Sequence, residues 1–263
     1  MIELQQVSVI FNPGTQDERR ALQEVNLTIQ KGDFLTVIGS NGAGKSTLLN
    51  VIAGSISPVK GRILIEGKDR TGEAEFRRAR VIGRVYQNPL AGTAAEMTVE
   101  DNLAIALKKG RKTLRLGLNT KIRSRLRDAL AQLDMGLEHR MKENVSRLSG
   151  GQRQALTLLM AVLSSPAILL LDEHTAALDP ANAEKVMSLT QHFAREYNLS
   201  VLMVTHDMAE ALAIGNRLIM MDRGEIIYEC QGEEKQHLTV DMLVERFRRL
   251  RHRDFAGDAA LLG

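Results

Sequence analysis

Glycines, a lysine and hydroxyl side chains are combined in residues 39–47 in a way that suits an anion. The segment reads Gly39-Ser40-Asn41-Gly42-Ala43-Gly44-Lys45-Ser46-Thr47. It follows the apolar run 34–38 and precedes the helix-like run 48–52, the context in which the pattern G-x-x-x-x-G-K-[ST] binds phosphate. The glycines let backbone N–H groups converge on phosphate oxygens, and the helix start adds partial positive charge. We therefore expect this loop to hold a nucleoside triphosphate, with Lys45 at the β- and γ-phosphates and Ser46 as a ligand of Mg²⁺.

A second anion-binding helix start is expected at the segment Leu148-Ser149-Gly150-Gly151-Gln152. Ser149 is a good N-cap, and an apolar helix face follows it between residues 155 and 163. A helix that opens with Ser-Gly-Gly presents a hydroxyl and bare N–H groups at its positive end. Because the chain already has one phosphate loop, we expect this segment to serve a nucleotide held by another copy of the chain. Taken alone, the motif also fits a capped helix with a Gly-Gly hinge.

Two adjacent carboxylates follow a buried-type strand. The apolar run 168–171 leads directly into Asp172 and Glu173, and buried strands of such sheets end at the ligand crevice. Asp172 is expected to hold Mg²⁺ through its water shell. Glu173 is expected to orient and deprotonate the attacking water. The alternative is a surface Asp-Glu pair at a strand end, which the neighbouring motifs disfavour.

Three further side chains are candidates for contact with the nucleotide. His206 ends the next apolar strand, where it can reach a γ-phosphate and help to hold the attacking water beside Glu173. Gln87 lies between the strand-rich start and a helical block, where its amide can ligate Mg²⁺ or water and report occupancy to the helical part. Phe11 is the only aromatic residue of the first strand region, and it could stack on adenine or belong to the core. Cys230 and the other histidines show no ligand spacing with one another, so no transition-metal site is expected.

The composition is that of an ordinary globular protein. The 263 residues are 44% hydrophobic and 25% charged, enough for one large α/β domain or two small ones. No apolar run approaches the length of a membrane helix, and no secretion signal is visible. Because Cys230 is the only cysteine, an intramolecular disulfide is excluded and the cytosol is the simplest compartment.

Positive charge is local rather than general. The net charge of +3 is too small to indicate nucleic-acid binding, and no nucleic-acid partner is expected. Basic residues gather in 111–127 and 246–253, which we interpret as two solvated helix faces. Contact with anionic lipid head groups or with an acidic partner is the alternative.

The hydrophobic pattern predicts an α/β protein with a helical insertion. Strand-like runs lie near residues 4–9, 21–29, 63–65, 167–171, 201–204, 218–221 and 226–228. Helical periodicity dominates from about 97 to 145 and returns at 183–197 and 208–213, an alternation that indicates parallel βα units. We expect one domain over 1–263, with a catalytic core formed by 1–96 and 146–235, a helical subdomain over about 97–145, and a helical tail over about 236–263.

Taken together, these residues resemble the nucleotide-binding subunit of an ATP-binding-cassette (ABC) transporter over nearly the whole chain. The motifs follow the family order: Phe11, Gly39 to Thr47, Gln87, Leu148 to Gln152, Asp172-Glu173, Ala177-Leu178-Asp179 and His206. The resemblance implies an α/β P-loop NTPase of the ABC type, with a mixed-sheet, RecA-like core, an N-terminal antiparallel β subdomain and an inserted helical subdomain. It implies ATP and Mg²⁺ as ligands. It also implies a head-to-tail homodimer in which each ATP lies between one chain's phosphate loop and the other chain's Ser149 to Gln152, with Asp179 at the contact across the dimer.

The resemblance further implies partners at a membrane. Closure and reopening of the dimer would drive a separate transmembrane permease from the cytoplasmic face of the inner membrane, with an extracytoplasmic substrate-binding protein taking part indirectly. Import is favoured because the cassette is a separate chain. The segments 11–15, 39–41, 89–93 and 172–177 look like a bacterial branch that works with permeases of the branched-chain amino-acid type. Some members of that branch are linked to uptake of aromatic amino acids such as tryptophan or tyrosine.

Three residues depart from the common family pattern. His174 stands where proline is common, Ala176 where serine is common, and Phe11 where tyrosine is more frequent. Without the serine hydroxyl, the contact across the dimer is left to backbone and Asp179. Phe11 keeps an aromatic face and lacks the hydroxyl.

The main alternative is a soluble ABC-type ATPase such as an iron–sulfur assembly factor. A DNA-repair ATPase of this type would need a long coiled coil before Leu148, and heptads are not sustained here. A translation factor of the family would carry two cassettes. A small-molecule phosphotransferase, from outside the family, would leave the segment Leu148 to Gln152 without a role.

Overall fold

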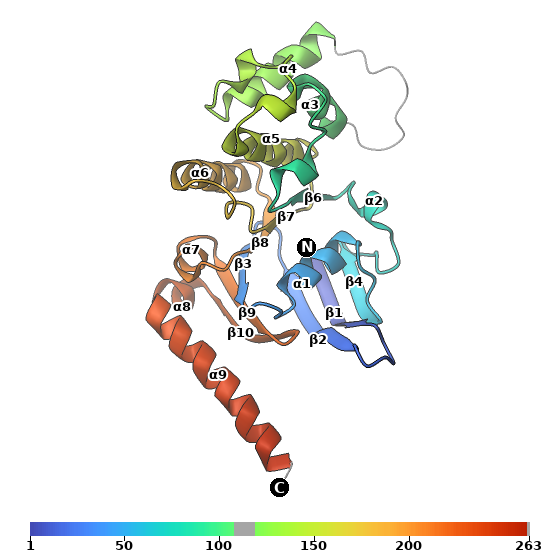
Figure 1. Ribbon diagram of the computed structural model, residues 1–263, viewed down its shortest axis with the longest axis vertical. Coiled ribbons are helices and arrows are strands. Elements are labelled where there is room, and N and C mark those ends of the chain that lie inside the picture. Colours follow the sequence, from blue (N-terminus) through green and yellow to red (C-terminus); the bar gives the residue numbers. More distant parts are fainter. Residues whose placement is uncertain (108–118, 262–263) are drawn as a thin grey trace.

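The chain folds into two β-sheets with helices packed around them, and the computed structural model describes residues 1–107 and 119–261. The basic residues expected at 111–118 therefore lie outside the described residues. In Figure 1, α3, α4 and α5 lie at one end of the molecule and strands β1, β2 and β4 towards the other. The helix α9 (Val240–Leu261) extends away from the body.

An antiparallel sheet of four strands is built mostly from the N-terminal residues. Its order is β2-β1-β4-β5, from β1 (Ile2–Phe11), β2 (Arg19–Ile29), β4 (Lys60–Ile65) and β5 (Lys68–Asp69). This is the β subdomain expected from the sequence.

A mixed sheet of six strands forms the centre of the protein. Its order is β10-β9-β3-β8-β7-β6, from β3 (Phe34–Gly39), β6 (Ile82–Val85), β7 (Ile168–Asp172), β8 (Ser200–Val204), β9 (Arg217–Asp222) and β10 (Glu225–Gln231). All neighbouring pairs are parallel except β9 with β10, which form an antiparallel hairpin at the strand-like runs predicted near 218–221 and 226–228.

The helices pack on both faces of this central sheet. They are α1 (Lys45–Ala53), α2 (Glu75–Arg78), α3 (Val99–Leu107), α4 (Thr120–Ala131), α5 (Gly150–Leu163), α6 (Pro180–Glu196), α7 (Met208–Ala213) and α8 (Gly232–Gln236). Between β6 and α5, the described residues include the 3₁₀ turns η1 (Pro89–Gly92), η2 (Leu137–His139) and η3 (Val145–Arg147). Among the described residues, no helix is long and apolar enough to cross a membrane.

The central sheet divides the hydrophobic core into two parts. Side chains alternate along β7, so that Leu169 and Leu171 pack with α5, α6 and the helical subdomain. Ile168 and Leu170 pack on the opposite face with α1 and the four-stranded sheet. The helical subdomain therefore shares its core with one face of the sheet, and the phosphate loop shares its core with the other.

Helix α6 begins three residues before the predicted start at Ala183. Asp179 is its N-cap and accepts a hydrogen bond from the backbone N of Asn182 at 3.1 Å, and Pro180 occupies the first turn. Both residues are common start signals, which the apolar periodicity used for the prediction does not contain.

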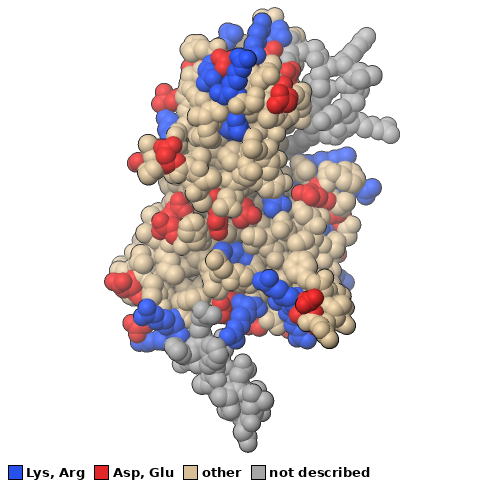
Figure 2. Space-filling model, viewed as in Figure 1, with Lys and Arg blue, Asp and Glu red and all other residues tan. Residues whose placement is uncertain are grey.

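The predicted basic helix faces are partly compensated by acidic neighbours. In Figure 2, Lys and Arg side chains gather over the α4 end of the molecule, with Asp and Glu among them. Arg123 of α4 pairs with Glu100 at 3.0 Å, and Arg246 of α9 pairs with Glu234 at 3.1 Å. These pairs agree with the interpretation as solvated faces.

Arg78 is a buried arginine that the hydrophobic pattern does not predict. Its side chain is at the end of α2 and the residue is 1% exposed. The guanidinium donates to the carbonyl oxygens of Val51 at 2.6 Å and Ile52 at 2.9 Å, in the last turn of α1. It also donates to the carbonyls of Thr71 at 2.9 Å and Glu73 at 3.0 Å. Arg78 thus satisfies helix-end carbonyls that would otherwise be buried without a donor.

We expect Arg78→Met to lower the free energy of unfolding by about 3 kcal/mol, because it leaves several buried carbonyls unpaired. Urea denaturation would measure the change. The matched control is Arg77→Met, because Arg77 is an exposed neighbour on the same helix and its loss should change stability by less than about 0.5 kcal/mol. Equal stability of the Arg78 variant and the wild type would contradict this role.

Candidate active site

Four neighbouring parallel strands bring the predicted chemical groups to one edge of the central sheet. The strands β3, β8, β7 and β6 lie side by side in this order and run in the same direction. Their carboxyl ends lead into Lys45, His206, Asp172-Glu173 and Gln87 respectively. The sheet order thus places residues from four distant parts of the sequence together, as ligand sites of open α/β sheets require.

Backbone crowding explains two glycines of the loop after β3. A Cβ on Gly39 would lie 2.2 Å from the carbonyl oxygen of Met221, and one on Gly44 would lie 2.5 Å from that of Ala21. Gly44 also has a φ of 103°, which side-chain-bearing residues rarely adopt. The loop can therefore pack against β2 and β9 only with glycine at these two positions.

Lys45 is buried inside the loop rather than extended into solvent. It is 7% exposed, and its Nζ donates to the carbonyl oxygens of Gly39 at 2.8 Å and Ser40 at 3.1 Å. Burial lowers the pKa of the Lys45 ammonium, and the nearby carboxylates of Glu173 and Asp172 oppose that shift. The ammonium is thus held where an anion in the loop would meet it.

The loop has further contacts that the sequence did not indicate. The Ser40 hydroxyl donates to Asp222 Oδ1 at 2.7 Å, and the backbone N of Gly224 donates to the carbonyl of Ala43 at 2.9 Å. Arg19 Nη2 donates to the carbonyl of Gly42 at 3.2 Å. The turn between β9 and β10 and the start of β2 therefore support the loop from outside.

Phe11 ends β1 directly opposite Arg19 in the antiparallel pair. It is 38% exposed, which argues against a core position and leaves its aromatic face accessible to a base.

The other residues of the phosphate loop differ in exposure. Asn41, Gly42 and Ser46 are exposed, and Thr47 is half-buried.

Asp172 and Glu173 lie in different surroundings. Burial raises the pKa of the Asp172 carboxyl, Arg84 and Lys45 oppose this shift, and Glu173 adds to it. Glu173 has a φ of 44°, in the left-handed region that glutamate seldom adopts. Its Oε2 lies 3.5 Å from Nδ1 of the exposed His206. The structure therefore brings Glu173 and His206 together, as their predicted shared contact with an attacking water requires.

The residues predicted for Mg²⁺ supply oxygen donors only. Ser46, Gln87 and Asp172 offer a hydroxyl, an amide and a carboxylate, the hard ligands that Mg²⁺ prefers. Within residues 1–107 and 119–261, no three His, Cys, Asp or Glu side chains are grouped so as to hold a metal ion. Mg²⁺ usually binds through one or two protein ligands together with substrate phosphates, so this donor set fits the ion.

Ser149 caps α5 in a closed capping box. Its Oγ accepts from the backbone N of Gln152 at 3.2 Å, and Gln152 Oε1 accepts from the backbone N of Ser149 at 3.2 Å. The Gln152 side chain also accepts from Arg140 at 3.0 Å and donates to the carbonyl of Met135 at 3.2 Å. The bonds to Arg140 and Met135 tie the start of α5 to the helical subdomain, while Ser149 and Gly150 are exposed.

The start of α5 packs against the start of α6. A Cβ on Gly151 would lie 2.3 Å from Asn182 Oδ1, so glycine is required here for close approach. The Asn182 side chain donates to Asp179 Oδ2 at 2.6 Å. Asp179, predicted at the contact across a dimer, is exposed and caps α6 within its own chain.

Gln154 links two parts of the site, and sequence reasoning missed it. This residue of α5 is completely buried, and its Nε2 donates to the carbonyls of Tyr86 at 3.0 Å and His174 at 2.6 Å. Tyr86 precedes Gln87, and His174 follows Glu173, so one amide joins both segments to the helix that Ser149 caps. The sequence does place a glutamine among the apolar residues of α5. Because a buried amide needs hydrogen-bond partners, that glutamine could have indicated a contact with neighbouring segments.

His174, one of the departures from the family pattern, is a buried structural residue. It is 1% exposed, and its Nε2 lies 3.0 Å from the Thr190 hydroxyl on α6. That hydroxyl donates to the carbonyl of Val186 at 2.9 Å, so Nε2 of His174 carries the proton and donates to Thr190. Burial lowers the pKa of His174 to about 4. The neutral ring thus ties the backbone after Glu173 to α6.

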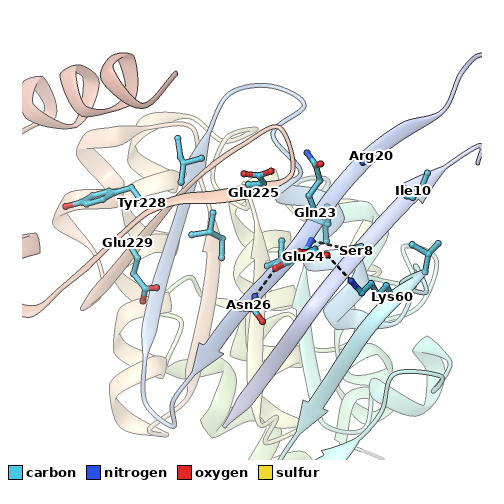
Figure 3. A pocket seen from close by; sticks show the side chains of 15 residues that line it. Ser8, Ile10, Arg20, Gln23, Glu24, Asn26, Lys60, Glu225, Tyr228 and Glu229 are labelled. Atoms are coloured by element: carbon cyan, nitrogen blue, oxygen red, sulfur yellow. Dashed lines mark hydrogen bonds and ion pairs between the residues drawn. The ribbon is translucent and has the colours of Figure 1, made fainter. Parts of the chain in front are cut away.

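An open groove of about 920 Å³ lies away from these residues, between β10 and strands β1, β2 and β4. Figure 3 shows Gln23, Glu225 and the ion pair of Glu24 with Lys60 around it; the two charged atoms are 2.8 Å apart. Its lining includes none of the predicted site residues. We therefore place the site at the strand ends and not in this groove.

Comparison with known proteins gives one consistent result. A family model described as "ABC transporter" matches residues 22–176. A "Tyrosine transport ATP-binding protein" of Clostridioides difficile (strain R20291) is 41% identical over 248 residues, covering 94% of this chain and 98% of that protein.

Solved structures agree with this result. An ATP-binding cassette of an ABC transporter, MJ1267 in its ADP conformation, has a TM-score of 0.76 at 27% identity and covers 94% of this chain and 98% of its own. The cassette MJ0796, solved as a dimer in a post-hydrolysis state with ADP and phosphate, has a TM-score of 0.73 at 29% identity, covering 88% of this chain and 98% of its own.

The free energy of unfolding should depend on pH because His174 is buried in its neutral form. With a folded pKa of about 4 and an ordinary value of 6.5, the unfolded chain binds more protons than the folded chain between these two pH values. The contribution of neutral His174 is therefore complete above pH 6.5 and is lost as the pH falls. We expect the stability advantage of the wild type over His174→Gln to shrink by about 2–3 kcal/mol between pH 7.5 and 4.5. Urea denaturation across this range would measure it, with exposed His237→Gln as the control; a constant difference would contradict the prediction.

Proposed function

This chain belongs to the ATP-binding subunits of ABC transporters, and we propose that it powers the import of a small solute through a separate membrane permease. Members of this family hydrolyse ATP. The observation that carries the proposal is the edge of the central sheet to which the strand order brings Lys45, Gln87, Glu173 and His206. The capped start of α5 is exposed and is bonded to the helical subdomain.

We assign the chemistry of hydrolysis to residues at the ends of four strands. The loop from Gly39 to Thr47 binds the phosphates, with the Lys45 ammonium opposite the β- and γ-phosphates. Glu173 orients and deprotonates the attacking water, and His206 holds that water and the γ-phosphate in place. Ser46, Gln87 and Asp172 would hold Mg²⁺, which would supply positive charge against the phosphates. Phe11 stacks on the adenine.

We infer that the working unit is a head-to-tail dimer. Ser149 and Gly150 are exposed at the start of α5, and a helix start is an anion site, one that the phosphate loop of the same chain does not need. A second copy can place its bound ATP against this helix start. The related cassette MJ0796 was solved as a dimer with ADP and phosphate, which supports this arrangement. Asp179 is exposed beside the helix start and is expected at the same interface.

The permease is expected to dock in a groove of about 540 Å³ between α2, β6, α3 and α5. Its rim includes Phe76, which is 69% exposed, and Ile105, which is 36% exposed. Exposed aromatic residues beside a groove are typical of interaction sites. Gly92, in the turn that follows Gln87, also lines it. An apolar segment of a permease in this groove would therefore lie next to the segment that carries Gln87.

The solute is proposed to be an amino acid, and aromatic amino acids are the first candidates. The name of the tyrosine transport relative, with 41% identity over nearly the full length of both chains, supports this choice. The subunit would then lie at the cytoplasmic face of the inner membrane, and an extracytoplasmic binding protein would deliver the solute. The iron–sulfur assembly alternative gains no support from the relatives.

Replacing Glu173 with glutamine should trap the ATP-bound dimer. The amide cannot accept the proton of the attacking water, so hydrolysis should fall by at least about 100-fold, while the phosphate loop stays intact. Size-exclusion chromatography with light scattering should show a shift from monomer to dimer when ATP is added. The double variant with Lys45→Ala should stay monomeric with ATP. Failure of ATP to dimerise the Glu173→Gln variant would count against the head-to-tail site.

Replacing Phe76 with aspartate should weaken the contact with the permease and leave ATP binding unchanged. Loss of an aromatic anchor costs about 2 kcal/mol, so recovery of permease with the tagged subunit from membranes should fall about 30-fold. Val59→Asp is the control, because Val59 is 57% exposed and lines the other groove. Equal recovery with both variants would place the permease elsewhere.

A further inference from the structure

One arginine links the proposed permease groove to the carboxylate assigned to Mg²⁺. Arg84 lies on β6, lines the groove, and has a side chain that is only 13% exposed. Its Nη2 donates to Asn50 Oδ1 on α1 at 2.6 Å and lies 4.0 Å from Asp172 Oδ2. Its Nη1 lies 3.8 Å from Glu75 Oε1 on α2. The guanidinium therefore stands between two carboxylates, one inside the site and one at its rim.

Among the described residues, Arg84 is the side chain within ion-pair distance of Asp172. The other nearby cation, Lys45, directs its ammonium to the carbonyls of Gly39 and Ser40. At 4.0 Å the contact of Arg84 with Asp172 is an ion pair without a hydrogen bond. The guanidinium therefore offsets the negative charge of Asp172 without holding the carboxylate in one orientation.

Arg84 makes two further weak contacts. Its Nη1 donates to the Ser55 hydroxyl oxygen at 3.4 Å. Its carbon Cζ lies 4.5 Å from the centre of the Tyr86 ring, within the range of a cation–π contact. Its Nε is buried and has no hydrogen-bond partner among the described residues. Glu75, whose side chain is 48% exposed, offers a second carboxylate farther from the phosphate loop.

We propose that Arg84 is a positioning residue that serves as the counter-ion of Asp172 before the nucleotide arrives and competes with Mg²⁺ for that carboxylate. This inference rests on the proposed role of Asp172 in holding Mg²⁺. A divalent cation beside Asp172 repels the guanidinium, and the guanidinium in turn weakens binding of the cation. Arg84 thus sets how much nucleotide affinity the subunit gains from Mg²⁺.

The test compares the affinity for a fluorescent, non-hydrolysable ATP analogue in EDTA with that in saturating Mg²⁺. The ratio of the two dissociation constants is the gain due to Mg²⁺. In Arg84→Gln this ratio should rise by about 3- to 10-fold over the wild type, because the competing charge is absent. Arg84→Lys, which keeps the charge, should restore a ratio close to that of the wild type.

Each ratio is measured within one variant, so a loss of folded protein does not change it. Arg77→Gln removes the same charge from an exposed position on α2 and should leave the ratio unchanged. An unchanged or smaller ratio in Arg84→Gln would overturn the proposal. A wild type whose affinity for the analogue does not respond to Mg²⁺ would instead overturn the Mg²⁺ site itself.

Discussion

The site depends on the register of four parallel strands. Asp172 at the end of β7 lies opposite Val204 of β8, and Val204 lies opposite Val37, two residues before Gly39 at the end of β3. On the other side, Leu171 lies opposite Val85, two residues before Gln87. A slip of one residue in β7 would move its inward side chains to the opposite face and carry Asp172 away from the phosphate loop. Burial on both faces of the sheet prevents that slip, because each face of β7 packs in a different core.

Much of this arrangement could be predicted from the sequence, and the missing part has a common physical origin. Motifs at strand ends indicate their own surroundings, since a loop such as Gly39 to Thr47 carries its glycines, its lysine and its helix within a few residues. The roles of Arg78, Arg84 and Gln154 depend on partners from 20 to 88 residues away. Periodicity contains no information about such pairs. The predicted start of α6 lies three residues after the observed one for a different reason. The helix start is marked by Asp179 and Pro180, which lie outside the apolar pattern used for the prediction.

The chain replaces a rigid proline after Glu173 with a hydrogen-bonded histidine. His174 holds this backbone from α6 through Thr190, and Gln154 holds it from α5 through the His174 carbonyl. The left-handed backbone of Glu173 is thus fixed by neighbours on two helices rather than by the ring of a proline. Ala176, the other departure in this segment, is exposed.

The division of the core by the central sheet has a consequence for how the molecule opens. Helix α1 and the antiparallel sheet pack on one face, and α5, α6 and the helical subdomain pack on the other. Each half can loosen without exposing the buried side chains of the other, because only the sheet is shared. Amide hydrogen exchange should then divide into two groups of protection factors. A nucleotide in the phosphate loop slows exchange in the first group, and a protein seated on the helical side slows exchange in the second.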